Sequence, residues 1–247
     1  MTSFQGFLRF GFGAAVAFSL LSGPVRAEDV REGAGERPVL VELFLSQACP
    51  MCPKAAALFP DIAARDDVVA LSWHIDYWNM TSSPDGSWAD PYSHAAFTKR
   101  QKRYNKNIRH KSSIYTPQVV VDGVAETVGA KQEKIEALIE TAPRAGAAVN
   151  SSLSDGAIAF EIGESEHGGN AYLVIFKKRA STRITSGYNK GKVFDEAHVV
   201  TGVQPLGLVR KRGGEIRVGR PADNEACALI VQEPGQARVV AAAYCPG

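Results

Sequence analysis

The first half of the chain alternates continuous apolar runs with segments of helical periodicity. Residues 38–46 and 68–76 are apolar runs of strand length, which is typical of strands covered on both faces of a sheet. Two further runs flank a turn-forming Asp-Gly pair. We expect strands over 38–46, 68–76, 117–121 and 125–128, and helices over 49–65, 90–108 and 130–141. This order predicts an α/β domain over residues 38–145, a mixed sheet with flanking helices.

After Pro143 the pattern changes to short alternating runs separated by turns that contain glycine or proline. The expected strands are 157–162, 171–176, 198–203, 206–209, 215–218, 226–232 and 238–244. Short strands at this spacing predict an all-β, sandwich-like domain over residues 146–247.

The N-terminus has the pattern of a secretory signal. Arg9 precedes an apolar stretch over residues 10–21, and small residues at 25 and 27 predict cleavage after Ala27. Residues 28–37 are expected to form a loose arm. A transmembrane helix needs about 20 apolar residues, so we expect a periplasmic or secreted protein with no integral membrane span in the mature chain. An uncleaved N-terminal anchor is the alternative.

Charge excludes a dedicated nucleic-acid binder. The formal charge is +2, and removal of residues 1–27 takes away Arg9, Arg26 and no acidic residue, which leaves zero. A local basic cluster lies at residues 99–111. We interpret it as a solvated helix face, with docking of an acidic partner or an anionic membrane surface as the alternative.

Cys49 and Cys52 enclose Pro50-Met51 where a predicted strand meets a predicted helix. The positive end of a helix favours a thiolate, so a CxxC pair at this place is typical of reversible disulfide chemistry. Cys49, expected to be the more exposed, would attack, and Cys52 would resolve the mixed disulfide. A CxxC is also half of a zinc site, but no second CxxC occurs in the chain.

Three segments carry a family resemblance. VELFLSQACPMCPKA, WHIDYW and YTPQVVVDG resemble the DUF1223 family of exported bacterial proteins. The resemblance covers most of residues 38–247 and implies a thioredoxin-like domain followed by an all-β domain. It also implies a thiol–disulfide oxidoreductase whose substrate the family does not define. Pro50-Met51 between the cysteines and the later helix proline, Pro60, depart from thioredoxin itself.

The thioredoxin-like reading assigns further residues. In such folds a Thr-Pro pair opens the third strand, with the proline in cis and facing the CxxC, so Thr116 and Pro117 are candidate substrate-binding residues together with Tyr115. Such folds also often hold an acid beneath the CxxC that moves protons. Glu42 is the candidate, because a carboxylate within this apolar run is anomalous. A salt bridge at the sheet margin is its alternative role.

His74 and Trp78 lie at the end of the second strand, where α/β sheets form ligand clefts. Both are candidate substrate-binding residues. In the alternative function, Cys49, Cys52 and His74 hold copper or zinc in a carrier module. A satisfied structural histidine is the simpler reading of His74.

Cys227 and Cys245 are expected to form a structural disulfide, since free thiols are a liability in an oxidising compartment. A four-residue turn at 233–236 would place Cys227 opposite Ala242, so a direct cross-strand bridge does not follow from that register.

The sequence therefore predicts an exported thiol–disulfide oxidoreductase that acts on protein or small thiol substrates. Its partner is a protein with a thiol or disulfide, and its redox group is the Cys49–Cys52 disulfide, with no dissociable cofactor. A metal-binding module is one alternative. A binding protein with a structural 49–52 disulfide is another.

Overall fold

The computed structural model describes residues 1–2 and 37–246. Residues 3–36, which hold most of the predicted signal segment and arm, lie outside the described residues. No helix of the described residues has the length and apolar character that crossing a membrane requires.

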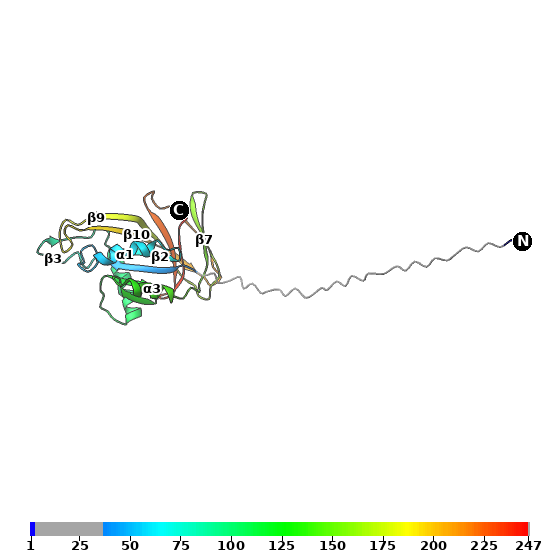
Figure 1. Cartoon of the computed structure of the whole chain (residues 1–247), viewed down its shortest axis with the longest axis horizontal. Helices are drawn as coiled ribbons and strands as arrows, with labels where there is room; N and C mark the ends of the chain where they lie inside the picture. Colours follow the sequence, from blue (N-terminus) through cyan, green and yellow to red (C-terminus); the bar gives the residue numbers. More distant parts are fainter. Residues whose placement is uncertain (3–36, 247) are drawn as a thin grey trace. The chain divides into compact units, whose positions relative to one another are not determined.

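One mixed sheet organises residues 37–246. Its strands are β1 (Val39–Leu45), β2 (Val68–His74), β5 (Gln118–Val121), β6 (Ala125–Val128), β9 (Gly169–Arg183), β10 (Val193–Val209), β12 (Ala226–Gln232) and β13 (Val239–Tyr244). Their order is β13–β12–β9–β10–β2–β1–β5–β6, with β1 and β2 parallel at the centre (Figure 1). Every residue of β1 and β2 is buried. The expected mixed α/β sheet with flanking helices is confirmed.

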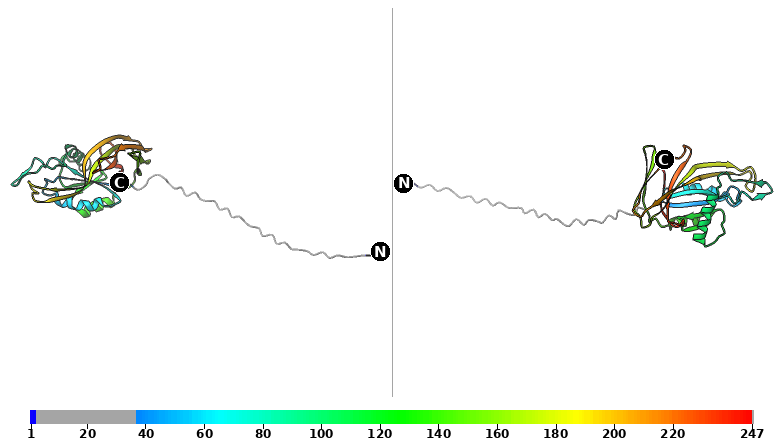
Figure 2. Two further views of the ribbon diagram at one scale, coloured as in Figure 1. Left: turned by 90° about the horizontal axis from the view of Figure 1, so that it is seen from above. Right: turned by 180° about the vertical axis from the view of Figure 1, so that it is seen from behind.

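Helices cover both faces of the central strands. Helices α1 (Pro53–Ala63) and α3 (Gln132–Glu140) lie on one face, above the odd-numbered residues of β1 (Figure 2). Helix α2 (Ala95–Tyr104) continues into a single π-helical turn, η1 (Asn105–Arg109), and packs on the even-numbered face. The alternation of a strand therefore decides which helix each side chain of β1 meets.

Helix α2 begins later than the sequence predicts. Asp90 begins a separate turn, in which one of its carboxylate oxygens accepts from the backbone N–H of Tyr92 at 3.0 Å. His94 is the N-cap, and its Nδ1 accepts from the backbone N–H of Ala96 at 3.0 Å. An Asp-Pro start signal thus marked a turn that precedes the helix.

The sheet continues across the expected domain boundary near residue 145. Strand β10 pairs in parallel with β2 through Val199 and Ser72, and the Ser72 hydroxyl donates to the Ala197 carbonyl at 2.9 Å. Residues on both sides of the boundary belong to one compact unit. The structure differs here from the expected separate all-β domain, because the outer edge of β2 has unpaired backbone groups that β10 satisfies.

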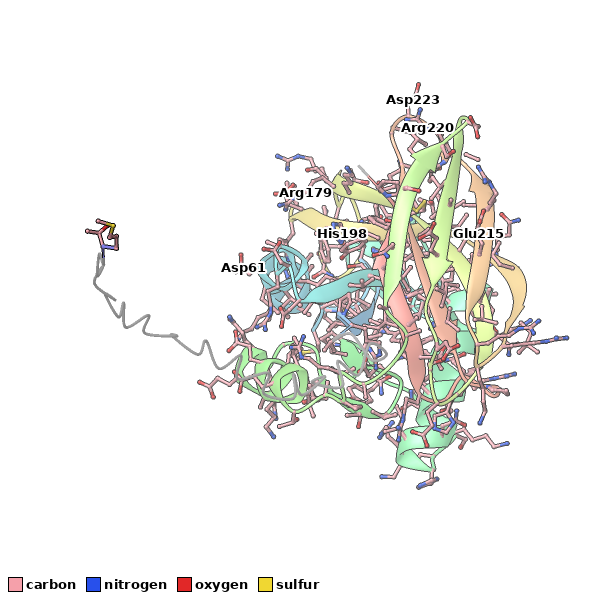
Figure 3. All side chains as sticks on the ribbon, turned by 90° about the vertical axis from the view of Figure 1, so that its right-hand side faces the viewer. Asp61, Arg179, His198, Glu215, Arg220 and Asp223 are labelled. Carbon is pink, nitrogen blue, oxygen red and sulfur yellow. A yellow bond between two sulfur atoms is a disulfide. The ribbon has the colours of Figure 1, made fainter. Side chains whose placement is uncertain are left out.

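A smaller sheet packs on the C-terminal strands. It contains β11 (Gly214–Gly219), β8 (Ala157–Ile162) and β7 (Val149–Ser154) in that order. Phe160 of β8 and Leu229 of β12 share a third apolar core. Figure 3 shows the tip of the loop between β11 and β12, where Arg220 and Asp223 lie close together. A two-stranded hairpin, β3 (Ser82–Ser83) and β4 (Gly86–Ser87), stands apart from both sheets.

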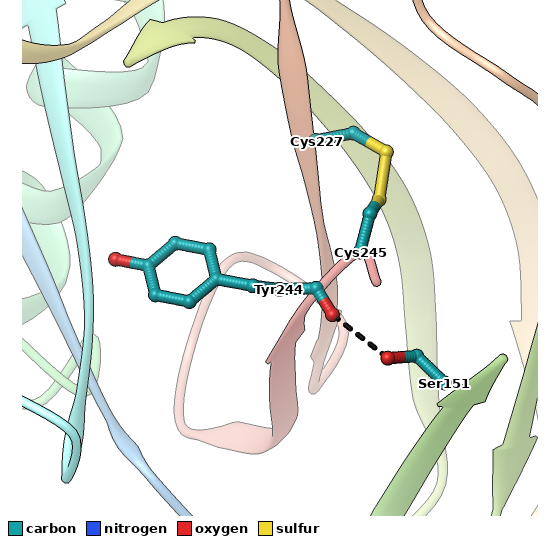
Figure 4. The surroundings of a disulfide bond; sticks show 4 residues. All are labelled: Ser151, Cys227, Tyr244 and Cys245. Carbon is teal, nitrogen blue, oxygen red and sulfur yellow. Dashed lines mark hydrogen bonds between the residues drawn. A yellow bond between two sulfur atoms is a disulfide. The ribbon is translucent and has the colours of Figure 1, made fainter. Parts of the chain in front are cut away.

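Cys227 of β12 and Cys245, which follows β13, form a disulfide with Cα atoms 5.2 Å apart (Figure 4). The expected pairing is confirmed, but the expected turn at 233–236 is wrong. A longer loop and a bulge shift the register, so Cys245 rather than Ala242 lies beside Cys227 and donates its N–H to the Cys227 carbonyl at 2.8 Å.

Removal of this disulfide should destabilise the fold. The bridge spans 18 residues, so the double variant Cys227→Ser, Cys245→Ser is expected to lose about 3 kcal/mol of unfolding free energy, measured by urea denaturation. Both proteins carry Cys49→Ser and Cys52→Ser, so that no other thiol responds to reductant. Dithiothreitol should lower the unfolding free energy of the protein that keeps Cys227 and Cys245 to that of the variant. It should leave the unfolding free energy of the variant unchanged. Equal unfolding free energies of the two proteins without reductant would contradict the expectation.

Candidate functional site

Cys49 and Cys52 lie in the tight turn that joins β1 to α1. The backbone N–H of Cys49 donates to the Ser46 carbonyl at 3.1 Å, and that of Cys52 donates to the Cys49 carbonyl at 3.2 Å. Cys52 is the N-cap of α1, which begins at Pro53. The predicted place of the pair at a strand–helix junction is confirmed. Both thiols therefore lie at the positive end of the helix.

The two thiols differ in acidity. The Cys52 thiol donates a hydrogen bond that lowers the pKa of Cys49 to about 7 against the opposing effect of burial, with help from the Thr116 side chain. Burial first, and then the neighbouring Cys49, raise the pKa of Cys52 well above its usual range. Near neutral pH the pair thus holds one thiolate, on Cys49, and one thiol, on Cys52.

The Thr116–Pro117 bond faces this pair and is cis, as the sequence predicts. The Cys49 Sγ lies 3.9 Å from the Thr116 carbonyl oxygen. Trp78 Nε1 donates to the Thr116 hydroxyl at 2.7 Å, which fixes that side chain. Three predicted site residues therefore meet at the cysteines: Thr116, Pro117 and Trp78.

Tyr115 is directed elsewhere. Its hydroxyl donates to a carboxylate oxygen of Glu126 on β6, and the guanidinium of Arg109 lies 4.9 Å from the centre of its ring. These contacts tie Tyr115 to β6 and η1 and give it a structural role just before β5.

Glu42 does not lie beneath the cysteines. It belongs to the even-numbered face of β1, whereas Cys49 and Cys52 pack with the odd-numbered face. Arg100 of α2 donates two hydrogen bonds to the Glu42 carboxylate, from Nε at 2.6 Å and from a terminal nitrogen at 3.0 Å. The Tyr104 hydroxyl donates to the same carboxylate. The predicted proton-shuttle position is wrong because strand alternation turns the side chain away. The ion pair is largely buried rather than marginal, with the Glu42 side chain 0% and the Arg100 side chain 12% exposed.

Arg100 also changes the interpretation of the basic segment. Lys99, Lys102, Arg103 and Lys106 are exposed, as a solvated face requires, while Arg100 is directed inward to Glu42. One member of the basic cluster is therefore directed into the protein rather than to solvent.

His74 is part of a buried charged cluster. Its Nδ1 lies 2.7 Å from Asp90 Oδ2 and its Nε2 lies 3.3 Å from Glu196 Oε1, and all three side chains are essentially unexposed. Although burial opposes the charge, Glu196 and Asp90 raise the pKa of His74 to about 9. The imidazole is thus held as a cation between two carboxyl groups.

This arrangement does not bring His74 to the cysteines as a metal ligand. Both of its ring nitrogens face carboxylates, and within residues 37–246 no group of three His, Cys, Asp or Glu side chains is placed to hold a metal ion. The copper or zinc set of Cys49, Cys52 and His74 is therefore not assembled among these residues.

Gln47 connects the charged cluster to the turn that holds Cys49 and Cys52. Its backbone N–H donates to Asp90 and its side-chain amide donates to Glu196, both at 2.7 Å. Its carbonyl accepts from Asn189 Nδ2 at 2.8 Å. The buried cluster thus fixes the chain two residues before Cys49.

Both cysteines are shielded from solvent. Cys49 and Cys52 each have 0% exposure, whereas Met51 between them is 70% exposed. The expectation that Cys49 is the more exposed cysteine is wrong. The chain between β9 and β10 lies over the turn, and its Asn189 donates to the Cys49 carbonyl at 2.8 Å.

Comparison with protein families identifies the chain's relatives. The model described as "Protein of unknown function (DUF1223)" matches residues 40–232. The chain belongs to the DUF1223 family. No curated protein matches its sequence.

Solved structures share the fold of this DUF1223 protein. A crystal structure of a protein from Agrobacterium tumefaciens has a TM-score of 0.71 at 24% identity, over 87% of this chain and 96% of that one. HBP35 of Porphyromonas gingivalis has a TM-score of 0.59 at 13% identity, over 86% of this chain and 76% of that one. At these identities the likeness concerns the fold alone.

Sequence reasoning missed Gln47, Asn189 and Glu196 in the DUF1223 site. Glu196 carried little signal, because it stands beside Asp195 and before the expected strand over 198–203. Asn189 carried none, since it stands 140 residues after Cys49 in a polar turn.

Substitution of Glu42 should test its separation from the thiols. Glu42→Gln is expected to lower the free energy of unfolding by about 3 kcal/mol, because Arg100 loses the partner of a buried ion pair. The ionisation midpoint of Cys49 should stay near pH 7, because the carboxylate lies on the other face of β1. Urea denaturation and the thiolate absorbance as a function of pH measure the two effects. A clear rise of the ionisation midpoint of Cys49 would contradict the separation of Glu42 from the thiols.

The His74 cluster should make stability depend on pH. Its pKa of about 9 in the fold exceeds the ordinary value of 6.5, so its contribution is complete below pH 6.5 and is lost as the pH rises to 9. Unfolding of the Cys49→Ser, Cys52→Ser protein, with and without His74→Asn, isolates this effect from thiol ionisation. The difference between the two proteins should shrink across that window. A constant difference would argue against a charged His74.

Proposed function

We propose that the chain is an exported thiol–disulfide oxidoreductase with a thioredoxin-like core, acting on protein or small thiol substrates. The observation that carries this proposal is the unequal pair of thiols beside the cis Thr116–Pro117 bond: a Cys49 pKa of about 7 and a Cys52 pKa well above its usual range. A structural pair has no need of such a difference, whereas disulfide exchange needs a nucleophile near the ambient pH.

The reaction follows from the two acidities. The Cys49 thiolate attacks one sulfur of a substrate disulfide; a mixed disulfide forms, and the other substrate sulfur leaves with the electron pair and takes a proton. The Cys52 thiol then loses its proton and attacks the Cys49 sulfur. The Cys49–Cys52 disulfide forms, and the substrate leaves as a dithiol. A dithiol partner then reduces the Cys49–Cys52 disulfide by the same exchange in reverse. If the partner is instead a disulfide, it oxidises the reduced cysteine pair, and the protein then oxidises its substrate.

The surroundings assign supporting roles. Thr116 and Pro117 frame the face of the pair, and Trp78 holds the Thr116 hydroxyl at 2.7 Å. Glu42 and His74 are engaged in their own ion pairs and take no step in this scheme. The redox group is the cysteine pair itself, so the proposal includes no dissociable cofactor.

Two features support the thioredoxin-like core and the export. A CxxC at the start of the first helix, parallel β1 and β2, and a cis proline before β5 occur in the order that a thioredoxin-like core requires. The Cys227–Cys245 disulfide fits an oxidising compartment, which agrees with the signal pattern of residues 1–27.

Single-cysteine variants test this function. In Cys52→Ser the first exchange step proceeds but resolution fails, so this variant should accumulate mixed disulfides with a scrambled, disulfide-bonded protein. Cys49→Ser, its matched control, should accumulate none. The reduction potential of the wild-type pair, obtained by equilibration with glutathione buffers, should lie above about −300 mV. A lower potential with no trapped adducts would identify the 49–52 pair as a structural disulfide of a binding protein.

A further inference from the structure

The chain between β9 and β10 packs on the redox turn, residues 46–52, which holds Cys49 and Cys52. Ile184 at its start and Phe194 in the first residues of β10 share the apolar core that holds both cysteines. Its middle reaches the β3–β4 hairpin, where the Ser186 hydroxyl donates to the Ser87 carbonyl at 2.6 Å. Figure 1 shows β3 at the same end of the described fold as the far ends of β9 and β10. We call residues 184–192 the cover segment.

Asn189 fastens the cover segment to the redox turn. Its side chain has 0% exposure, and its Nδ2 donates to the carbonyls of Gln47 and Cys49, both at 2.8 Å. Its Oδ1 accepts from Lys192 Nζ at 2.9 Å. One amide thus links two backbone acceptors of the turn to the cover segment, and a buried link of this kind is costly to break.

The other polar links of the cover segment run to the β3–β4 hairpin. Besides the Ser186 bond, the Gly187 N–H donates to the Asp85 carbonyl at 3.1 Å, and Lys190 pairs with Asp85 at 2.8 Å through side chains that are more than half exposed and contribute little. The Asn189 side chain therefore supplies the buried polar links from this segment to the turn that carries Cys49.

Disulfide exchange requires a change in the surroundings of Cys49. The attacking sulfur must meet its target in line with the bond that breaks, and Cys49 has no exposed surface along which a disulfide can approach. Some part of the chain around Cys49 must therefore move before it reacts.

We propose that the cover segment is a gate over Cys49 and that Asn189 is the positioning residue that holds it shut. The proposal rests on the proposed function for the identity of the incoming group, a substrate disulfide, while the gate itself acts on any electrophile. Reaction proceeds through a less populated open state, and the rate follows the population of that state.

Alkylation by iodoacetamide tests the gate. The Cys49 thiolate displaces iodide and forms a carbon–sulfur bond, and peptide mass spectrometry identifies the modified cysteine of the reduced, full-length chain. Asn189→Ala should raise the rate about tenfold or more, because two backbone acceptors lose their donor. The midpoint of the pH–rate profile should stay near 7, because the hydrogen bonds that stabilise the thiolate come from Cys52 and Thr116.

A matched control exists in the same chain. Asn107 Nδ2 also donates to two carbonyls, of Gly235 at 2.9 Å and Gln236 at 3.2 Å, on an exposed surface. Asn107→Ala should leave the alkylation rate unchanged. Lys192→Met removes only the bond to Asn189 Oδ1, which keeps the test valid if Asn189→Ala does not fold, and it should raise the rate about threefold.

Three results would overturn the gate. The first is alkylation of Cys49 in the folded wild-type protein as fast as in the urea-unfolded protein. The second is alkylation of both the Asn189→Ala and the Lys192→Met variants at the wild-type rate. The third is a midpoint of the pH–rate profile that moves together with the rate, which indicates altered thiol acidity instead of altered access. Alkylation needs no exchange activity. Loss of the gate and failure of the proposed oxidoreductase function are therefore separate outcomes.

Discussion

The parallel pairing of β1 and β2 is the constraint on which the rest of the structure depends. Every residue of both strands is buried, so both faces and both outer edges of the pair need cover. The helices supply the faces, β5 pairs with the free edge of β1, and β10 pairs with that of β2. Parallel strands also end at one side of the sheet, which brings the turn with Cys49 and Cys52 after β1 near the charged cluster that begins at His74.

Strand alternation then divides the charges of the core. Glu42 and Cys49 come from the same strand and the turn that follows it, yet the carboxylate faces α2 and the thiol faces the α1 side. A negative charge on the thiol side would oppose formation of the Cys49 thiolate. The alternation keeps Glu42 away from it, where Arg100 neutralises the carboxylate. The low pKa of Cys49 comes from neutral donors instead.

Local pattern predicted what local sequence determines. The order of the main elements up to residue 141 and the strand–helix position of the cysteines follow from residues within one segment. The cis Thr116–Pro117 bond followed instead from the resemblance to thioredoxin-like folds. Strands β8 and β12 were also predicted, since both are short and mainly apolar. The far end of β9 was not, because Lys177–Arg183 is polar and its pairing depends on β10. Long-range partners were equally hidden: Glu196 for His74, and Asn189 for Cys49.

The C-terminal strands therefore complete both the sheet and the site. They contact β2 at a second place, where the hydroxyl of Tyr244, at the end of β13, accepts from the backbone N–H of Ala70 at 2.7 Å. Tyr244 precedes Cys245, so the disulfide with Cys227 restrains the strand end that carries this contact. One cysteine pair thus anchors the C-terminal strands against β2, and the same strands carry the segment that covers the other pair. The Cys227–Cys245 disulfide and the Cys49–Cys52 pair differ in chemistry but are linked through β9 and β10. The disulfide stabilises the fold that shields Cys49 and Cys52 from solvent.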